Sequence, residues 1–222
     1  MGLIAFLDTM LVPSSLFLTV GYHAYLWHNF KNKPSLTTFG IDTLRRRVWF
    51  QDMKEGDDKK GVLAVQSLRN TLMGTILTAS IAIIITLMLA ALASNTYNAS
   101  HLLNSAFFGS QSGRIVVLKF GSASLFLLVS FFCSSMALGY LIDANFLINA
   151  TGELSSPGYT QMIFERGFTL AVFGNRVMCI TFPLLLWMFG PVPVALSSVA
   201  LIWGLYMHDF NGDTKCGKQS RS

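Results

Sequence analysis

Long uncharged stretches dominate the pattern of polar and apolar positions along this chain. One runs over 9–30, a second has an apolar core over 71–93, a third covers 120–142, and a fourth covers 177–208. A helix that crosses the hydrocarbon core of a bilayer, about 30 Å thick, needs roughly 20 apolar residues. Strands of a membrane barrel would alternate in polarity, and these stretches do not. The first three stretches therefore each predict one membrane-spanning helix.

The fourth stretch is too long for a single untilted span, and Gly190-Pro191-Val192-Pro193 lies near its middle. Proline removes a backbone donor and disfavours helix in the residue before it. We therefore predict an all-α, polytopic membrane protein with four spans, the last of them broken at Gly190-Pro193. Five spans are the alternative, and the basic C-terminal tail favours it because five spans would place that tail in the cytosol.

The composition supports a membrane protein over a soluble one. Only 12% of the 222 residues are charged, 52% are hydrophobic, and the mean hydropathy is +0.52. An ordinary soluble domain has roughly 25% charged residues, so too few charges are present here to cover a water-exposed surface. We expect the lipid bilayer to be the main partner of this chain.

The charges that are present gather in one segment, residues 31–70, which holds nine of the 16 Lys and Arg residues. A basic connection next to a span faces the cytosol. We therefore predict one transmembrane domain over 1–208, with a cytosolic basic loop at 31–70, and a polar tail over 209–222. The net charge of +5 comes without any nucleic-acid-binding motif, so we expect no nucleic acid as partner.

A short basic helix is predicted over 41–50, inside this loop. Its candidate residues for binding lipid or a membrane surface are Arg45, Arg46, Arg47 and Trp49. On the cytosolic leaflet such a helix could bind anionic lipid head groups, at about 1 kcal/mol per basic residue. The alternative is that the cluster only enforces the orientation of the chain.

The second span carries small and hydroxylated residues at spacings of 4, 3, 4, 4 and 4, which places them on one helical stripe. Two interpretations compete: close packing between helices in lipid, and a hydroxyl-lined wall of a water-filled pore. The stripe consists of Thr71, Thr75, Thr78, Ala82, Thr86 and Ala90.

Acidic residues at the ends of spans are the other candidate pore groups. Asp8 lies at the start of the first span, and Asp143, followed by Asn145, lies at the end of the third. In a symmetric oligomer one carboxylate per chain forms a ring that attracts cations. The alternative for each of them is a carboxylate that caps a helix or pairs with a neighbour.

Residue patterns for catalysis or metal binding are missing from the sequence. The three cysteines are isolated, the histidines His23 and His28 lie on different helix faces, and no nucleophile or phosphate-binding motif is present. We therefore expect no enzymatic activity and no metal or other cofactor.

Several strings in the chain resemble a plant membrane-protein family known as domain of unknown function 599. They are Pro13 with Gly21-Tyr22-His23; Pro34 with Thr37-Thr38 and Gly40; Arg46-Arg47-Val48-Trp49; Val65-Gln66-Ser67-Leu68-Arg69-Asn70; Lys119; Gly174-Asn175-Arg176; Pro183-Leu184-Leu185-Leu186-Trp187 with Phe189-Gly190-Pro191; and Tyr206 with Asp209. The family name itself supplies no activity. Resemblance to one member of this family implies a pentameric, calcium-permeable cation channel in the membrane of the endoplasmic reticulum, rather than the plasma membrane, that acts in plant root defence.

The functional hypothesis is a homo-oligomeric cation channel with Ca²⁺ as permeant ion and a pore on the symmetry axis. The pore candidates are Asp8, Asp143, Asn145, Thr71, Thr75, Thr78 and Thr86. The alternative, from a different class, is a non-conducting membrane scaffold that recruits partners through the basic loop.

Overall fold

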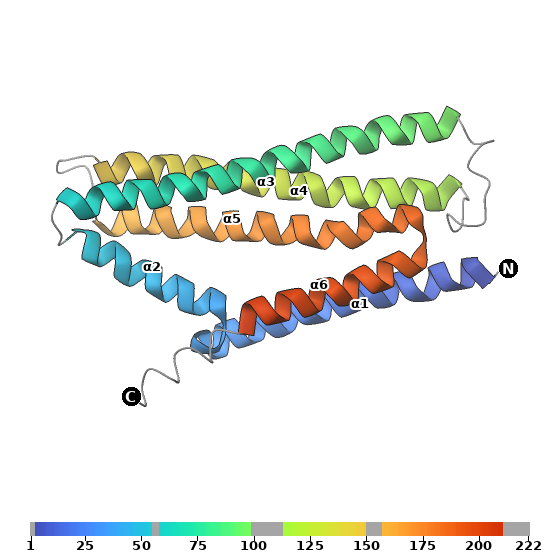
Figure 1. Cartoon of the computed structure of the whole chain (residues 1–222), viewed down its shortest axis with the longest axis horizontal. Coiled ribbons are helices and arrows are strands. Elements are labelled where there is room, and N and C mark those ends of the chain that lie inside the picture. Colours follow the sequence, from blue (N-terminus) through green and yellow to red (C-terminus); the bar gives the residue numbers. More distant parts are fainter. Residues whose placement is uncertain (1–2, 55–57, 99–112, 150–156, 211–222) are drawn as a thin grey trace. The chain divides into compact units, whose positions relative to one another are not determined.

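A computed structural model describes residues 3–54, 58–98, 113–149 and 157–210, and these residues are almost entirely helical (Figure 1). The helices are α1 (Leu3–Asn32), the 3-10 turn η1 (Pro34–Leu36), α2 (Thr38–Lys54), α3 (Asp58–Asn98), α4 (Gly113–Asn149), α5 (Pro157–Leu186), the 3-10 turn η3 (Trp187–Phe189) and α6 (Pro191–Phe210). The predicted all-α class is confirmed. The tail predicted over 209–222 lies outside the described residues from 211 onward.

Four helices in the described part of the chain are long and apolar enough to cross a membrane. These candidate spans are Val65–Asn95, Ile115–Ile148, Gly158–Phe189 and Pro191–Phe210. The number of spans agrees with the prediction, but their distribution differs. The region after 157 supplies two of them, and α1 is not among the four, although 9–30 is uncharged. The span predicted for α1 therefore stays a prediction.

The predicted break in the last hydrophobic region is confirmed at Gly190. This residue has φ 130° and ψ 175°, a backbone conformation that residues other than glycine rarely adopt. Pro191 then occupies the first position of α6, where its missing N–H would have had no helical partner anyway. Glycine and proline together end one apolar helix and begin the next, so the fourth stretch forms two helices instead of one kinked span.

Two units alternate along the chain. The first comprises residues 1–44, 93–123 and 180–222, and the second comprises residues 45–92 and 124–179. The first contains α1 and α6, and the second contains most of α3, α4 and α5.

The second unit is built around one face of α4. Six residues of this face are fully buried, and they recur at spacings of three and four, as in a heptad pattern. They are Leu127, Ser130, Ser134, Ala137, Leu141 and Ala144. Phe50 of α2, Leu68 of α3 and Phe164 of α5 complete the apolar core at its α2 end. Four of the six residues, Ser130, Ser134, Ala137 and Ala144, are small, and small residues let a neighbouring helix approach closely.

Two glycines of α5, seven residues apart, make this approach possible. A Cβ atom at Gly174 would lie 2.6 Å from Ser134 Oγ, and one at Gly167 would lie 2.9 Å from Leu141 Cγ. The hydroxyl of Ser130 donates a hydrogen bond of 2.7 Å to the carbonyl of Gly174. The α4–α5 contact therefore combines close packing with an interhelical hydrogen bond, which lipid does not compete for.

The first unit is organised by α1, which packs along α6. The buried residues of α1 recur at spacings of 4, 3, 4 and 3, and four of the five carry a polar group: Asp8, Val12, Ser15, Thr19 and Tyr22. The turn that follows α1 is held by Gly40, where any Cβ atom would fall against the backbone of Pro34, 2.7 Å from its carbonyl carbon. Thr38 also donates a 2.8 Å hydrogen bond to the carbonyl of His208, which ties this turn to the end of α6.

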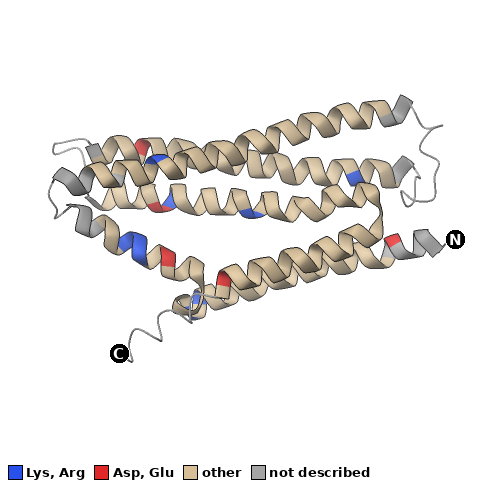
Figure 2. Ribbon diagram, viewed as in Figure 1, with Lys and Arg blue, Asp and Glu red and all other residues tan. Residues whose placement is uncertain are grey.

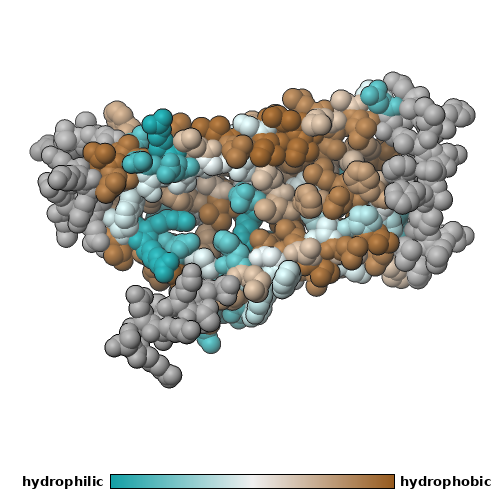
Figure 3. Space-filling model, viewed as in Figure 1, coloured by the Kyte–Doolittle hydropathy of each residue, from teal (hydrophilic) through white to brown (hydrophobic). Residues whose placement is uncertain are grey.

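Charged side chains are sparse along the described helices (Figure 2), and large apolar side chains point outward from them. Phe17 is 77% exposed, Phe146 72% and Trp203 69%. Figure 3 shows apolar residues over much of the visible surface. Outward-facing aromatic and aliphatic side chains on helices of this length are what a lipid environment requires.

Candidate functional site

Asp8 and Trp187 form a buried polar contact in the first unit. The indole N–H of Trp187 donates to Asp8 Oδ1 at 3.2 Å, and Asp8 is only 6% exposed. Lys119, 4% exposed, interacts electrostatically with Asp8, and its ammonium lies 5.8 Å from the centre of the Trp187 ring. The structure thus gives Asp8 a donor and a cation within its own chain, the geometry of a paired carboxylate.

A second buried acid lies at the end of α6. Asp209 is fully buried and accepts a 2.6 Å hydrogen bond from the hydroxyl of Tyr22. Its other oxygen lies 3.2 Å from Nδ1 of His208. Unsatisfied charge is costly among membrane helices, so this contact fastens α1 to α6.

Asp143 differs from these two acids because it lies on the exposed face of α4. It lies among the exposed apolar residues Met136, Ile142 and Phe146, and within the described residues no side chain bonds to it. Asn145 is half-buried on a different side of the helix. The structure therefore separates two neighbouring pore candidates.

The threonines of the α3 stripe differ in how deeply they are buried. Thr75 is 5% exposed, whereas Thr71, Thr78 and Thr86 are half-buried. Each of the four hydroxyls donates to the carbonyl four residues earlier on the same helix, at 2.8 to 3.3 Å. The burial of Thr75 favours the packing interpretation at that position, and pore lining by the stripe stays a prediction.

One arginine of the basic cluster of α2, Arg47, forms an ion pair with α5. Nε and Nη2 of Arg47 donate to the two oxygens of Glu165 at 3.0 and 3.1 Å, and Gln161 donates to the same carboxylate at 2.9 Å. The hydrogen bond and the negative charge of Glu165 raise the pKa of the Arg47 guanidinium above its ordinary value. Arg47 is thus committed to holding α2 against α5.

Arg45 and Arg46 instead line a groove of about 420 Å³ in the second unit. The groove contains no acidic side chain among its lining residues, which are Arg45, Arg46, Trp49, Ser67, Leu68, Thr71, Phe164 and Phe168. The guanidinium of Arg46 lies 4.0 Å from the centre of the Phe168 ring, and Trp49 stacks on Phe164 with ring centres 5.9 Å apart. The groove therefore has a cationic part and an aromatic part.

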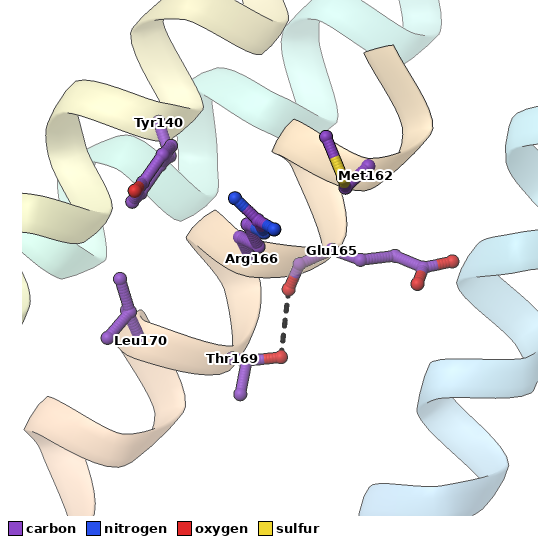
Figure 4. Close-up of a pocket in the computed structure, with 6 residues that line it drawn as sticks. All are labelled: Tyr140, Met162, Glu165, Arg166, Thr169 and Leu170. Atoms are coloured by element: carbon purple, nitrogen blue, oxygen red, sulfur yellow. Dashed lines mark hydrogen bonds between the residues drawn. The ribbon is translucent and has the colours of Figure 1, made fainter. Parts of the chain in front are cut away.

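Another open hollow, of about 570 Å³, lies between α4 and α5 and is lined by Tyr140, Met162, Glu165, Arg166, Thr169 and Leu170 (Figure 4). The carboxylate of Glu165 points out of the group and toward α2, whereas Arg166 lies on the side of Tyr140. The carboxylate of Glu165 is paired with Arg47, so the charged group that remains in this hollow is the guanidinium of Arg166.

Metal-binding geometry is absent from the described residues, where no three His, Cys, Asp or Glu side chains come close enough to hold an ion. Cys133 and Cys179 are free thiols. The expectation of no metal cofactor is not decided by this observation.

Sequence reasoning missed the partners of the buried acids. Lys119, Trp187 and Tyr22 occur in the strings that resemble the family, and no contact with an acid was predicted for them. The spacing of the polar residues Asp8, Ser15, Thr19 and Tyr22, at 7, 4 and 3 residues, was the available signal, because such spacing places them on one face of a helix.

The family model for proteins of unknown function, DUF599, matches residues 10–214. The chain belongs to the DUF599 family. No curated protein and no solved structure matches this chain. Family membership covers nearly every described helix and assigns no activity, so function has to be argued from the residues of this DUF599 protein.

Proposed function

We propose that this DUF599 protein forms a homo-oligomeric cation channel, with Ca²⁺ as permeant ion and the path on the symmetry axis. The observation that carries the proposal is Asp143, an exposed carboxylate five residues before the end of the span Ile115–Ile148. A charged group on the lipid face of a span is costly, so such groups usually face water or another protein surface. A ring of these carboxylates would attract cations and repel anions.

Dry packing inside the second unit supports placing the path between subunits. Leu127, Ser130 and Ser134 of α4 have 0% exposed surface, and their neighbours on α5 approach through glycines. Side chains packed this closely leave no room for a file of water molecules. A symmetric assembly is the arrangement that gives each carboxylate identical neighbours around one axis.

Three finer features of the proposal come from the family resemblance. They are assembly as a pentamer, location in the endoplasmic reticulum and a role in plant defence. Contact of α2 with anionic lipid head groups is part of the proposal as well, supported by the exposed side chains of Leu44, Val48 and Arg45 along the helix. The mechanism requires no catalytic step.

Planar bilayers test conduction and the role of Asp143 together. With a tenfold gradient of CaCl₂, the current through a path that passes only Ca²⁺ reverses at the Ca²⁺ equilibrium potential, which lies about 30 mV from zero. We expect the purified oligomer to reverse near this value. Asp143→Asn should move the reversal potential toward that of Cl⁻, because it removes the ring of charge, and Asp143→Glu should restore it.

The buried acid provides the comparison. Asp8→Asn should leave the reversal potential unchanged and lower thermal stability, because Asp8 is bonded within its own chain. A potential that shifts with Asp8→Asn and not with Asp143→Asn would assign the selectivity site to Asp8 instead of Asp143. Silent bilayers from well-folded oligomer would reject the channel and favour a non-conducting scaffold.

A further inference from the structure

Arg166 is a charged side chain inside a candidate span, and the described part of the chain supplies no counter-ion to it. It lies eight residues into the span Gly158–Phe189, about 12 Å from its start, and it is exposed. Among the described residues, none forms a hydrogen bond or an ion pair with it. The adjacent acid, Glu165, points toward α2 and pairs with Arg47 (Figure 4). A guanidinium at this depth is costly unless an anion or water reaches it.

Asp143 carries the opposite charge at a similar depth in the same unit. It is exposed and lies five residues, about 7.5 Å, before the end of the span Ile115–Ile148. Leu141 of α4 and Phe164 of α5 belong to one buried core, so the end of α4 and the start of α5 lie side by side. The depths of Asp143 and Arg166 therefore differ by less than one helical turn.

The helical geometry keeps these two charges apart within one chain. A Cβ atom at Gly167 would lie 2.9 Å from Leu141 Cγ and 3.2 Å from Tyr140 Cβ, so α5 passes α4 on the side of Leu141. Two residues along a helix correspond to a rotation of about 200°, which places Asp143 on the opposite side of α4 from Leu141. Arg166, in contrast, lies beside Tyr140 (Figure 4). The carboxylate thus points away from α5 and from the guanidinium.

The open hollow beside Arg166 can receive a carboxylate from another molecule. It measures about 570 Å³, and the side chains of Tyr140 and Thr169 line it together with Arg166. Arginine binds carboxylates with charge-assisted, often paired, hydrogen bonds. Within the described parts of the four candidate spans, Asp143 is the one exposed acid. A second copy of this chain therefore brings the complementary charge to the membrane at the matching depth.

We propose that Arg166 of one copy binds Asp143 of a neighbouring copy, so that the hollow between α4 and α5 is a contact surface between subunits. One contact then removes two unpaired charges from lipid. A carboxylate has two oxygens, so Asp143 can bond to Arg166 and still present an oxygen to water or a cation in the path. This contact rests on the self-association that the proposed function includes, and not on conduction.

Native mass spectrometry of the full chain in a non-ionic detergent measures self-association and bound lipid together. Arg166→Gln should weaken self-association by at least about tenfold, because Asp143 loses its charged partner. The variant should fold as well as the parent, since it removes a charge from a span. Arg69→Gln removes the same charge from an exposed residue of α3 and should change self-association by less than about twofold. Equal effects of the two substitutions would overturn the proposal.

An exchange of the two charges tests whether the pair is direct. Asp143→Arg should weaken self-association by at least about tenfold, and the double variant Asp143→Arg, Arg166→Asp should restore it to within about threefold of the parent. A double variant that associates no better than Asp143→Arg would overturn the proposal. So would an Arg166→Gln variant that keeps the parent's oligomer but loses bound dioleoyl phosphatidic acid, because the hollow would then hold a lipid phosphate.

The oligomer is counted without any current, so the contact and the channel fail separately. Rescue by the charge exchange, together with silent bilayers from the parent protein, would reject conduction and support the contact. Parent currents, together with no rescue by the double variant, would support the channel and reject the contact.

Discussion

Gly174→Ala should destabilise the protein, although alanine is the better helix former. The new Cβ atom would lie 2.6 Å from Ser134 Oγ and 3.2 Å from both Ser130 O and Ser134 N. Two of these three atoms belong to the α4 backbone, so rotation of the serine alone cannot relieve the contact, and α5 has to move away. Overpacking of this kind costs about 1–3 kcal/mol.

Two smaller effects modify that figure. Separation of the helices weakens the 2.7 Å hydrogen bond from Ser130 to the Gly174 carbonyl, and interhelical bonds in membranes contribute about 0.6 kcal/mol. Replacing glycine inside a helix returns up to about 1 kcal/mol. We therefore expect a net loss of about 0.5–2.5 kcal/mol in the free energy of unfolding, measured by thermal unfolding in detergent.

Gly74→Ala is the matched control, because a Cβ atom at Gly74 has no heavy atom within 4 Å. This variant should be as stable as the parent protein or slightly more so. The double variant Gly174→Ala, Ser134→Ala should recover part of the loss, since the closest clashing atom is gone. If Gly174→Ala is as stable as Gly74→Ala, the close α4–α5 contact is wrong.

Two further substitutions test the first unit. Gly40→Ala should prevent correct folding of the turn after α1, because the Cβ atom would strike the Pro34 backbone, whereas Gly21→Ala has open space and should fold normally; yield of monodisperse protein compares the two. Tyr22→Phe should lower the free energy of unfolding by about 1.5–3 kcal/mol by removing a hydrogen bond to the buried carboxylate of Asp209, and an unchanged melting temperature would contradict that contact.

The helices and the break between the last two could be predicted because both depend on local chemistry. Uncharged stretches of sufficient length must be helical in lipid, and Gly190-Pro191 ends one helix and starts another by backbone geometry alone. The predicted helix over 41–50 also falls within α2. The start of α5 at Pro157 was not predicted, because the fourth uncharged stretch begins only at residue 177.

Long-range contacts were beyond sequence reasoning for a different reason. Arg45, Arg46 and Arg47 form one cluster in the sequence, and only the position of Glu165, 118 residues away, shows that Arg47 forms an ion pair with α5, while Arg45 and Arg46 line a groove. A helix can be predicted from its own residues, whereas the choice of partner depends on how several helices pack.

Asp8 and Asp143 show how such partners change the interpretation of similar residues. Both are single acids near the ends of apolar helices, and the sequence offers no reason to prefer one as a pore group. Trp187 lies 179 residues from Asp8 and donates to it, with Lys119 providing a nearby positive charge, so burial of Asp8 needs no water. Asp143 receives no such bond from the described residues and remains exposed among apolar side chains. The cost of leaving that carboxylate in lipid has to be offset by water or by a neighbouring subunit. Substitution of Asp8 therefore tests stability, and substitution of Asp143 tests assembly and ion selectivity.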